Sequence, residues 1–200
     1  MPPKYTLYAP PGSFRAFAPL VAAEINQIDV DVVTEDIEKV VAEKSPTGKA
    51  PLLETPDGVI FSSHAMARYI GALRRDTGLL GRNTQEKSSV NAWMDWCAQE
   101  VELPCCVWFY PVAGYLEKNE SNSAKAAKDL GAALGVLNDA LQDKTFLIHD
   151  SLVTLADIVI ASTLLYPFKF VADATYLKPY PNVVRWFQNC VGQQDFAAGT

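Results

Sequence analysis

The chain has 200 residues, of which 49% are hydrophobic, 20% charged and 10% aromatic, so it has the composition of a folded globular protein rather than a disordered or collagen-like one. Its 17 lysines and arginines are outnumbered by 23 aspartates and glutamates, giving a net charge of -6. Because basic groups supply most of the affinity for phosphates, we expect neither nucleic acid nor an acidic membrane as a direct ligand.

The first 76 residues alternate between short strand and helix patterns. In chain order we expect a strand at 5–8, a helix at 13–25, a strand at 29–34, a helix at 35–43, strands at 49–54 and 59–61, and a helix at 64–75. The turn sequence Pro56-Asp57-Gly58 joins the last two strands as a hairpin, and Ser62 or Ser63 caps the last helix. This order predicts a thioredoxin-like α/β domain over residues 1–76.

The composition changes after a linker at 77–83, and the rest of the chain contains no convincing strand pattern. We expect helices at 84–117, 121–142, 154–172 and 181–191. Pro104 and Pro111 should kink or interrupt the first of these tracts, because proline lacks the helical N–H donor. Thr154 and Asp157 fit a capping box, which is a folding signal. The sequence therefore predicts a second, all-α domain over 84–200.

The cysteines and the apolar segments indicate a cytoplasmic protein without a metal. The four cysteines have no CxxC spacing and no histidine partners at zinc-ligand intervals, which favours buried thiols in a reducing compartment. The N-terminus has no apolar run of signal-peptide length. The longest apolar tract, 155–171, is interrupted by Asp157, Pro167 and Lys169, so we expect no membrane insertion.

Two features in the first domain suggest a site for a small acidic peptide. A proline at the first residue of a strand, here Pro51 after Lys49 and Ala50, is typically cis in a thioredoxin-like fold, which turns the preceding backbone outward to pair with an extended ligand. An edge-strand proline without a ligand is the alternative. Ser62 and Ser63 begin a helix, whose N-terminus can bind a carboxylate, although ordinary capping would explain them too.

The loop after the first strand is where thioredoxin-like redox proteins carry a reactive cysteine. No cysteine precedes Cys97, so chemistry of that kind is excluded there. Tyr8, Ser13 and Arg15 remain as candidates that could favour the thiolate of a bound thiol. The alternatives are a core residue for Tyr8, a helix cap for Ser13 and an ion pair for Arg15.

Aromatic residues of the second domain could serve an acceptor substrate. Trp108 and Tyr115 are candidates to line an apolar pocket for it. Core packing is the alternative for both side chains.

The sequence resembles the glutathione S-transferase superfamily over its entire length, and this resemblance rests on two segments. SPTGKAPLLETPDGVIFSSHAMARYI, residues 45–70, resembles its glutathione-site pattern, and LVTLADIVIASTLL, residues 152–165, resembles its C-terminal capping signature. Within the superfamily the chain looks most like the N-terminal domain of the gamma subunits of translation elongation factor 1. The marks are the segments at 6–24, 61–70, 93–97, 108–111, 145–171 and 181–196.

The resemblance implies site residues for glutathione or a related thiol as cosubstrate or ligand. It assigns Lys49 to the glycine end, Ala50 and Pro51 to backbone pairing with the cysteinyl part, and Ser62 and Ser63 to the γ-glutamyl group. Ser62 stands where the family commonly has Glu or Gln, which removes a partner for the γ-glutamyl ammonium. Tyr8 lies near the tyrosine position of tyrosine-type members, and Ser13 is about one residue off the serine-type register.

Three functions follow from the resemblance. The first is a docking module for the nucleotide-exchange subunits of the elongation factor 1 complex, with thiol binding and modest transferase activity. The second is a detoxifying transferase that conjugates glutathione to electrophiles. The third is an appended domain of an aminoacyl-tRNA synthetase. Superfamily members usually pair two subunits, so the resemblance also implies a homodimer.

Overall fold

The structure is a computed structural model that describes residues 4–199, and these residues form two compact units. The first unit comprises the chain up to Leu80 together with the residues from Gln194 onward, and the second unit spans Gly81–Gln193. The division after Leu80 falls inside the segment expected to be a linker. The last residues differ from the expectation, because we placed the whole of 84–200 in the helical domain.

The first unit contains the predicted strands and helices in the predicted order. Its elements are β1 (Tyr5–Tyr8), α1 (Phe14–Asn26), β2 (Val30–Val33), α2 (Ile37–Lys44), β3 (Leu52–Thr55), β4 (Gly58–Phe61), α3 (Ser63–Leu73) and, from the far end of the chain, α10 (Gln194–Ala198). The strand and helix bounds lie within a few residues of those expected from periodicity. α10 was not predicted, because five residues are too few to display a helical repeat.

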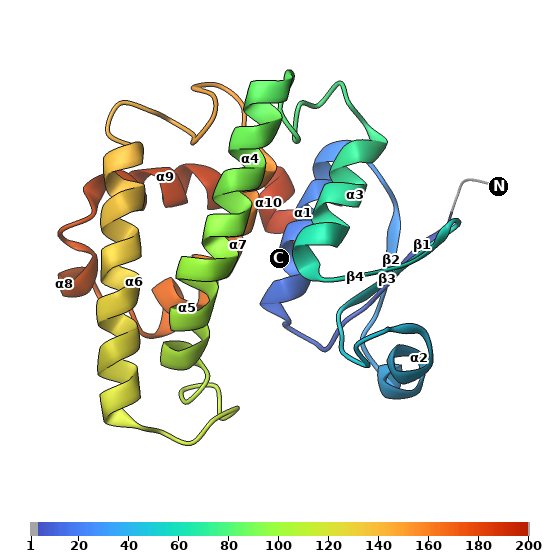
Figure 1. The fold of residues 1–200 in the computed structure, drawn as a ribbon, viewed down its shortest axis with the longest axis horizontal. Coiled ribbons are helices and arrows are strands. Elements are labelled where there is room, and N and C mark those ends of the chain that lie inside the picture. Colours follow the sequence, from blue (N-terminus) through green and yellow to red (C-terminus); the bar gives the residue numbers. More distant parts are fainter. Residues whose placement is uncertain (1–3, 200) are drawn as a thin grey trace. The chain divides into compact units, whose positions relative to one another are not determined.

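The four strands form one mixed sheet in the order β2-β1-β3-β4, with β1 and β2 parallel and the other pairs antiparallel. Leu7 and Leu53, which lie opposite each other in the sheet, are fully buried. The opposite face carries α2, where Ile37 and Val41 pack against Leu52 (Figure 1). The sheet is thus covered on both faces, which confirms the thioredoxin-like arrangement of this unit.

Helix α10 packs on α1 and completes the first unit. Phe196 is buried. Gly199 follows the helix so closely against α1 that a Cβ atom there would lie 2.6 Å from the backbone nitrogen of Val21. Only glycine fits at this contact without a shift of the backbone. The residues at the far end of the chain are therefore part of the same packed body as α1.

The second unit is all-helical, as predicted. It contains α4 (Thr84–Trp96), a π-helical turn η1 (Cys97–Val101), α5 (Glu102–Phe109), α6 (Glu120–Ala140), α7 (Leu155–Phe170), α8 (Ala174–Leu177) and α9 (Pro181–Val191). The prediction of one helical tract over 84–117 was wrong in extent. The π-helical turn ends three residues before Pro104, which has no N–H to donate to the preceding turn, and α5 ends two residues before Pro111.

The predicted capping box at the start of α7 is present and has further partners. The Asp157 carboxylate accepts hydrogen bonds from the backbone N and the Oγ1 of Thr154, at 3.0 and 2.9 Å. Its other oxygen accepts from Leu147 N and from the indole Nε1 of Trp186, both at 2.9 Å. Asp157 and Trp186 are fully buried, so this carboxylate ties α9 and the loop before α7 to the N-terminus of α7.

The longest apolar helix does not reach the length of a membrane span. Across residues 4–199, no helix combines the length and the hydropathy that crossing a bilayer requires.

Candidate functional site

The register of the sheet brings the predicted site segments of the first unit to one end of the sheet. Tyr8, the last residue of β1, pairs with Leu52, the first residue of β3, and Leu52 pairs with Phe61, the last residue of β4. The loop that leaves β1, the peptide bond before Leu52 and the turn after Phe61 must therefore lie side by side. Ser13, Pro51 and Ser62 belong to these three segments.

The segment that leads into β3 is held in place by a small polar turn. The Ala50–Pro51 peptide bond is cis, as predicted. Ser45 is buried, and its hydroxyl hydrogen-bonds with the Thr47 hydroxyl at 3.1 Å and donates to the carbonyl of Lys49 at 3.3 Å. Ala50 packs against the cluster of Ile37, Val41 and Leu52, whereas Lys49 is exposed. This turn fixes the backbone just before Pro51 and leaves the Lys49 ammonium in solvent.

The start of α3 offers an uncompensated helix N-terminus. Ser62 occupies the N-cap position with φ 71° and ψ 122°, and its side chain makes no capping hydrogen bond. A serine at positive φ is strained by about 1–3 kcal/mol, and strain of this kind clusters at functional sites. No acidic residue lies in the first turn of α3. The positive end of the helix is therefore available to an anionic group.

The start of α1 has the same character. Ser13 is at the N-cap position and half-buried, but its hydroxyl makes no capping hydrogen bond, and the first turn of α1 contains no acidic residue. Simple capping therefore does not account for Ser13. The guanidinium of Arg15 lies 4.7 Å from the centre of the Phe14 ring. A hydroxyl at a helix N-terminus can stabilise a thiolate, because both the hydrogen bond and the helix dipole favour the charged form.

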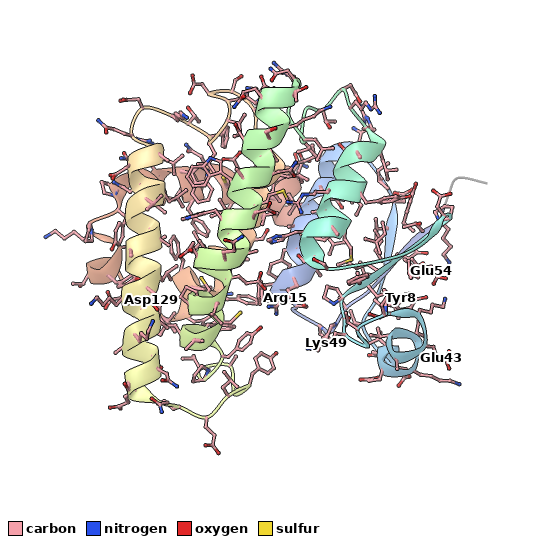
Figure 2. The ribbon with its side chains drawn as sticks, viewed as in Figure 1. Tyr8, Arg15, Glu43, Lys49, Glu54 and Asp129 are labelled. Atoms are coloured by element: carbon pink, nitrogen blue, oxygen red, sulfur yellow. The ribbon has the colours of Figure 1, made fainter. Side chains whose placement is uncertain are left out.

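The Tyr8 hydroxyl is engaged elsewhere in the first unit. It donates to Oε2 of Glu54 at 3.0 Å, and Oε1 of Glu54 accepts from Lys44 Nζ at 2.6 Å. Burial, followed by the hydrogen bond to Glu54, raises the pKa of Tyr8. Lys44, followed by Tyr8, lowers the pKa of Glu54. Figure 2 labels Tyr8 and Glu54 close together on the sheet. The sequence analysis did not predict the contacts of Glu54 with Tyr8 and Lys44, because the strand register that brings Glu54 beside Tyr8 is not visible in periodicity.

The buried cysteines are not candidates for nucleophilic chemistry. None of the four cysteines forms a disulfide; Cys97, Cys105 and Cys190 are buried and Cys106 is half-buried. Burial raises the pKa of Cys97 to about 12 and also raises that of Cys105, so these thiols stay protonated at neutral pH. Within the described residues, no group of three or more His, Cys, Asp or Glu side chains is placed to hold a metal ion.

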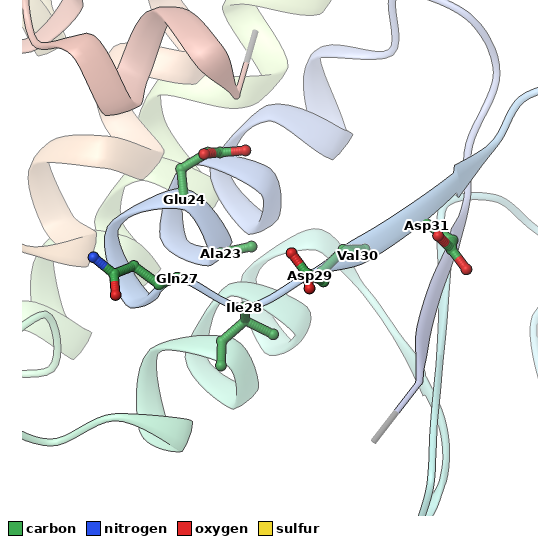
Figure 3. A pocket seen from close by; sticks show the side chains of 7 residues that line it. All are labelled: Ala23, Glu24, Gln27, Ile28, Asp29, Val30 and Asp31. Carbon is green, nitrogen blue, oxygen red and sulfur yellow. The ribbon is translucent and has the colours of Figure 1, made fainter. Parts of the chain in front are cut away.

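A surface pocket of about 390 Å³ lies at the opposite end of the sheet, where α1 ends and β2 begins (Figure 3). Three of its seven lining residues are acidic, namely Glu24, Asp29 and Asp31. None of the predicted site residues lines it. The pocket is therefore separate from the sheet end that carries Ser13, Pro51 and Ser62.

Two family models together match nearly the whole chain. The model described as the glutathione S-transferase N-terminal domain matches residues 3–72, and that of the glutathione S-transferase C-terminal domain matches residues 89–194. The chain belongs to the glutathione S-transferase family. This confirms the resemblance and the fold class predicted from the sequence.

Curated relatives of this glutathione S-transferase family member are named elongation factor 1-gamma, which is the group that the sequence resembles most. Elongation factor 1-gamma-A of Xenopus laevis is 32% identical over 203 residues, which cover 96% of this chain and 45% of the relative. Elongation factor 1-gamma 3 of Oryza sativa subsp. japonica is 35% identical over 197 residues, covering 95% and 47%. The chain thus spans about half the length of the curated relatives it matches.

Solved structures of the glutathione S-transferase family have the same fold. The GST-like domain of elongation factor 1-gamma from Saccharomyces cerevisiae superposes with a TM-score of 0.83 at 22% identity, covering 98% of this chain and 92% of that one. Poplar glutathione transferase F1 superposes with a TM-score of 0.88 at 19% identity, covering 98% and 96%. These likenesses establish the glutathione S-transferase fold for both units.

The two aromatic residues proposed for an acceptor pocket of this family member have different neighbours. The ring of Trp108 on α5 packs edge-on against Tyr176, with centroids 4.8 Å apart, and the Tyr176 hydroxyl donates to the carbonyl of Ala127. Tyr115 packs against Tyr110 with centroids 5.5 Å apart, and 70% of its surface is exposed. The contact with Tyr176 favours a packing role for Trp108, whereas Tyr115 is accessible to a ligand.

Proposed function

We propose that this chain is the glutathione S-transferase-like domain of an elongation factor 1-gamma subunit and that it acts in the cytoplasm as a docking module for the nucleotide-exchange subunits of that complex. The observation that carries the proposal is the 32–35% identity to elongation factor 1-gamma proteins over 95–96% of the chain. A homodimer and an appended synthetase domain remain predictions from the family resemblance.

Sedimentation velocity with a purified nucleotide-exchange subunit of elongation factor 1 tests the docking role. We expect the two proteins to sediment together at micromolar concentration. Poplar glutathione transferase F1 is the matched control, because it shares the fold at a TM-score of 0.88 but is only 19% identical. If the chain and the transferase behave alike, whether both bind or neither does, the docking role is wrong.

We further propose that the first unit binds glutathione or a related thiol. In this proposal Lys49 meets the glycine carboxylate, the Ala50–Pro51 backbone pairs with the cysteinyl part, and Ser62 and Ser63 hold the γ-glutamyl carboxylate at the start of α3. The support is the convergence of these segments at one sheet end, together with the uncompensated N-terminus of α3.

A transferase activity is the second candidate, and the hydroxyl of Ser13 favours it. This hydroxyl makes no capping bond and lies at the N-terminus of the 13-residue helix α1, where it would donate to the sulfur of a bound thiol. Arg15 is on the same first turn and would add positive potential. Tyr115 is the more accessible of the two residues proposed to meet an electrophile.

Replacing Ser13 with alanine should raise the pKa of the bound glutathione thiol by about one unit, because one hydrogen bond to the thiolate is lost. Conjugation of a chromogenic electrophile at neutral pH should fall about tenfold. Ultraviolet absorbance of the thiolate across a pH series measures the first effect. Ser121→Ala on α6 is the control, and an equal effect in both variants would remove Ser13 from the mechanism.

A further inference from the structure

The direction of the Tyr8 side chain is informative about which hydroxyl can meet a bound thiol. Tyr8 ends β1 beside Leu52, so its backbone lies at the sheet end that carries Pro51 and Ser62. Its hydroxyl bonds to Glu54, which pairs with Thr6, two residues earlier along β1. Tyr8 packs against the cluster of Ile37, Val41 and Leu52, so its ring lies on the face of the sheet that carries α2, where Glu54 holds the hydroxyl.

Glu54 is itself held in position by a cation. Lys44, the last residue of α2, donates to one carboxylate oxygen at 2.6 Å, and Tyr8 donates to the other at 3.0 Å. Lys44 lowers the pKa of Glu54, so this carboxylate is ionised at neutral pH and accepts both bonds. A hydrogen bond to a charged acceptor is about twice as strong as one between neutral groups. The Tyr8 proton is consequently committed to Glu54.

We propose that Glu54, held by Lys44, is a positioning residue that withholds the Tyr8 hydroxyl from thiol chemistry and leaves Ser13 as the hydroxyl that meets the sulfur. The inference rests on the proposed thiol binding in the first unit. It predicts that the tyrosine can act as a thiolate donor once its acceptor is removed. Loss of Glu54 would then add a donor to the site, whereas loss of a merely structural contact would not.

The test compares three variants, Glu54→Ala, Tyr8→Phe and the double variant, by the pH dependence of thiolate absorbance in saturating glutathione. We expect Glu54→Ala to lower the pKa of the bound thiol by about one unit, giving about ten times more thiolate at pH values below it. Tyr8→Phe alone should leave the thiol pKa unchanged. The double variant should return it to the wild-type value, because the freed phenol is absent.

The outcomes separate this inference from the proposed function. If glutathione does not bind the wild type in calorimetry, both are overturned. If glutathione binds but its thiol pKa is unshifted in Glu54→Ala, or if the shift survives in the double variant, only the role of Glu54 is overturned.

A readout without ligand guards against loss of fold. The tyrosinate titration of Tyr8, taken as the difference from Tyr8→Phe, should move to lower pH in Glu54→Ala. The side chains of Glu54 and Lys44 are 37% and 40% exposed, so the substitution leaves no cavity. Glu54→Gln keeps an acceptor without the charge and should give a smaller shift in the same direction. An unchanged titration in both variants would contradict the proposed role.

Discussion

Replacing Asp157 with alanine should destabilise the second unit by about 3–5 kcal/mol. The carboxylate accepts four hydrogen bonds in a fully buried position, and its removal leaves the donors of Thr154, Leu147 and Trp186 without partners. Each buried unsatisfied group costs about 1–3 kcal/mol. Burial raises the pKa of Asp157, whereas the four hydrogen bonds from Leu147, Trp186 and Thr154 favour its ionised form. The stability lost in the alanine variant is therefore the contribution of these hydrogen bonds.

Urea denaturation followed by tryptophan fluorescence measures this effect, because all four tryptophans, at positions 93, 96, 108 and 186, belong to the second unit. Trp186→Phe keeps an aromatic ring but removes the indole donor and leaves a cavity, so it should cost more than the roughly 1 kcal/mol of one hydrogen bond. Asp150→Ala changes an exposed carboxylate in the same loop region and should stay within about 0.5 kcal/mol of the wild type. A loss for Asp157→Ala no larger than that of Asp150→Ala would contradict the network.

Replacing Asn26 with leucine should destabilise the first unit by about 2–4 kcal/mol. Asn26 is fully buried at the end of α1, where its Nδ2 donates to the carbonyl of Ile70 at 2.7 Å and its Oδ1 accepts from the Thr77 hydroxyl at 2.7 Å. Leucine has nearly the same size but satisfies neither group, so two polar atoms lose their partners in an apolar environment.

Hydrogen exchange of the β1 and β3 amides measures the stability of the first unit, which contains no tryptophan. Thr77→Val removes one of the two bonds and should cost about half as much as Asn26→Leu. If exchange in β1 and β3 is as slow in Asn26→Leu as in the wild type, the side chain does not join α1 to the end of α3 in the way described.

The sequence predicted long or strongly patterned elements better than short ones. Helix α9 was predicted over its full range, 181–191, because its apolar residues repeat at helical spacing. Helices α8 and α10 have four and five residues, which is too short for a repeat to appear. The break at η1 depends on how the turn before Pro104 rearranges, and periodicity does not describe that.

Features of the candidate site that depend on local chemistry were predicted, whereas contacts that depend on strand register were missed. The cis peptide bond before Pro51 and the start of α3 at the two serines were predicted from the residues themselves. The interaction of Tyr8 with Glu54 joins residues 46 positions apart, and it exists only because β3 pairs with β1 in one particular alignment. Asn26 was overlooked for a related reason, since a polar residue at the end of a helix normally faces solvent.

The packing of α10 on α1 has a consequence for how this chain is made. A nascent chain emerges from the ribosome with its N-terminus first, and domains generally fold as units while synthesis continues. Here the second unit, 81–193, is contiguous in sequence, whereas the first also includes the segment with Phe196 and Gly199, and Gly199 lies against Val21. The half that is synthesised first therefore reaches its complete form last, after the helical half has left the exit tunnel.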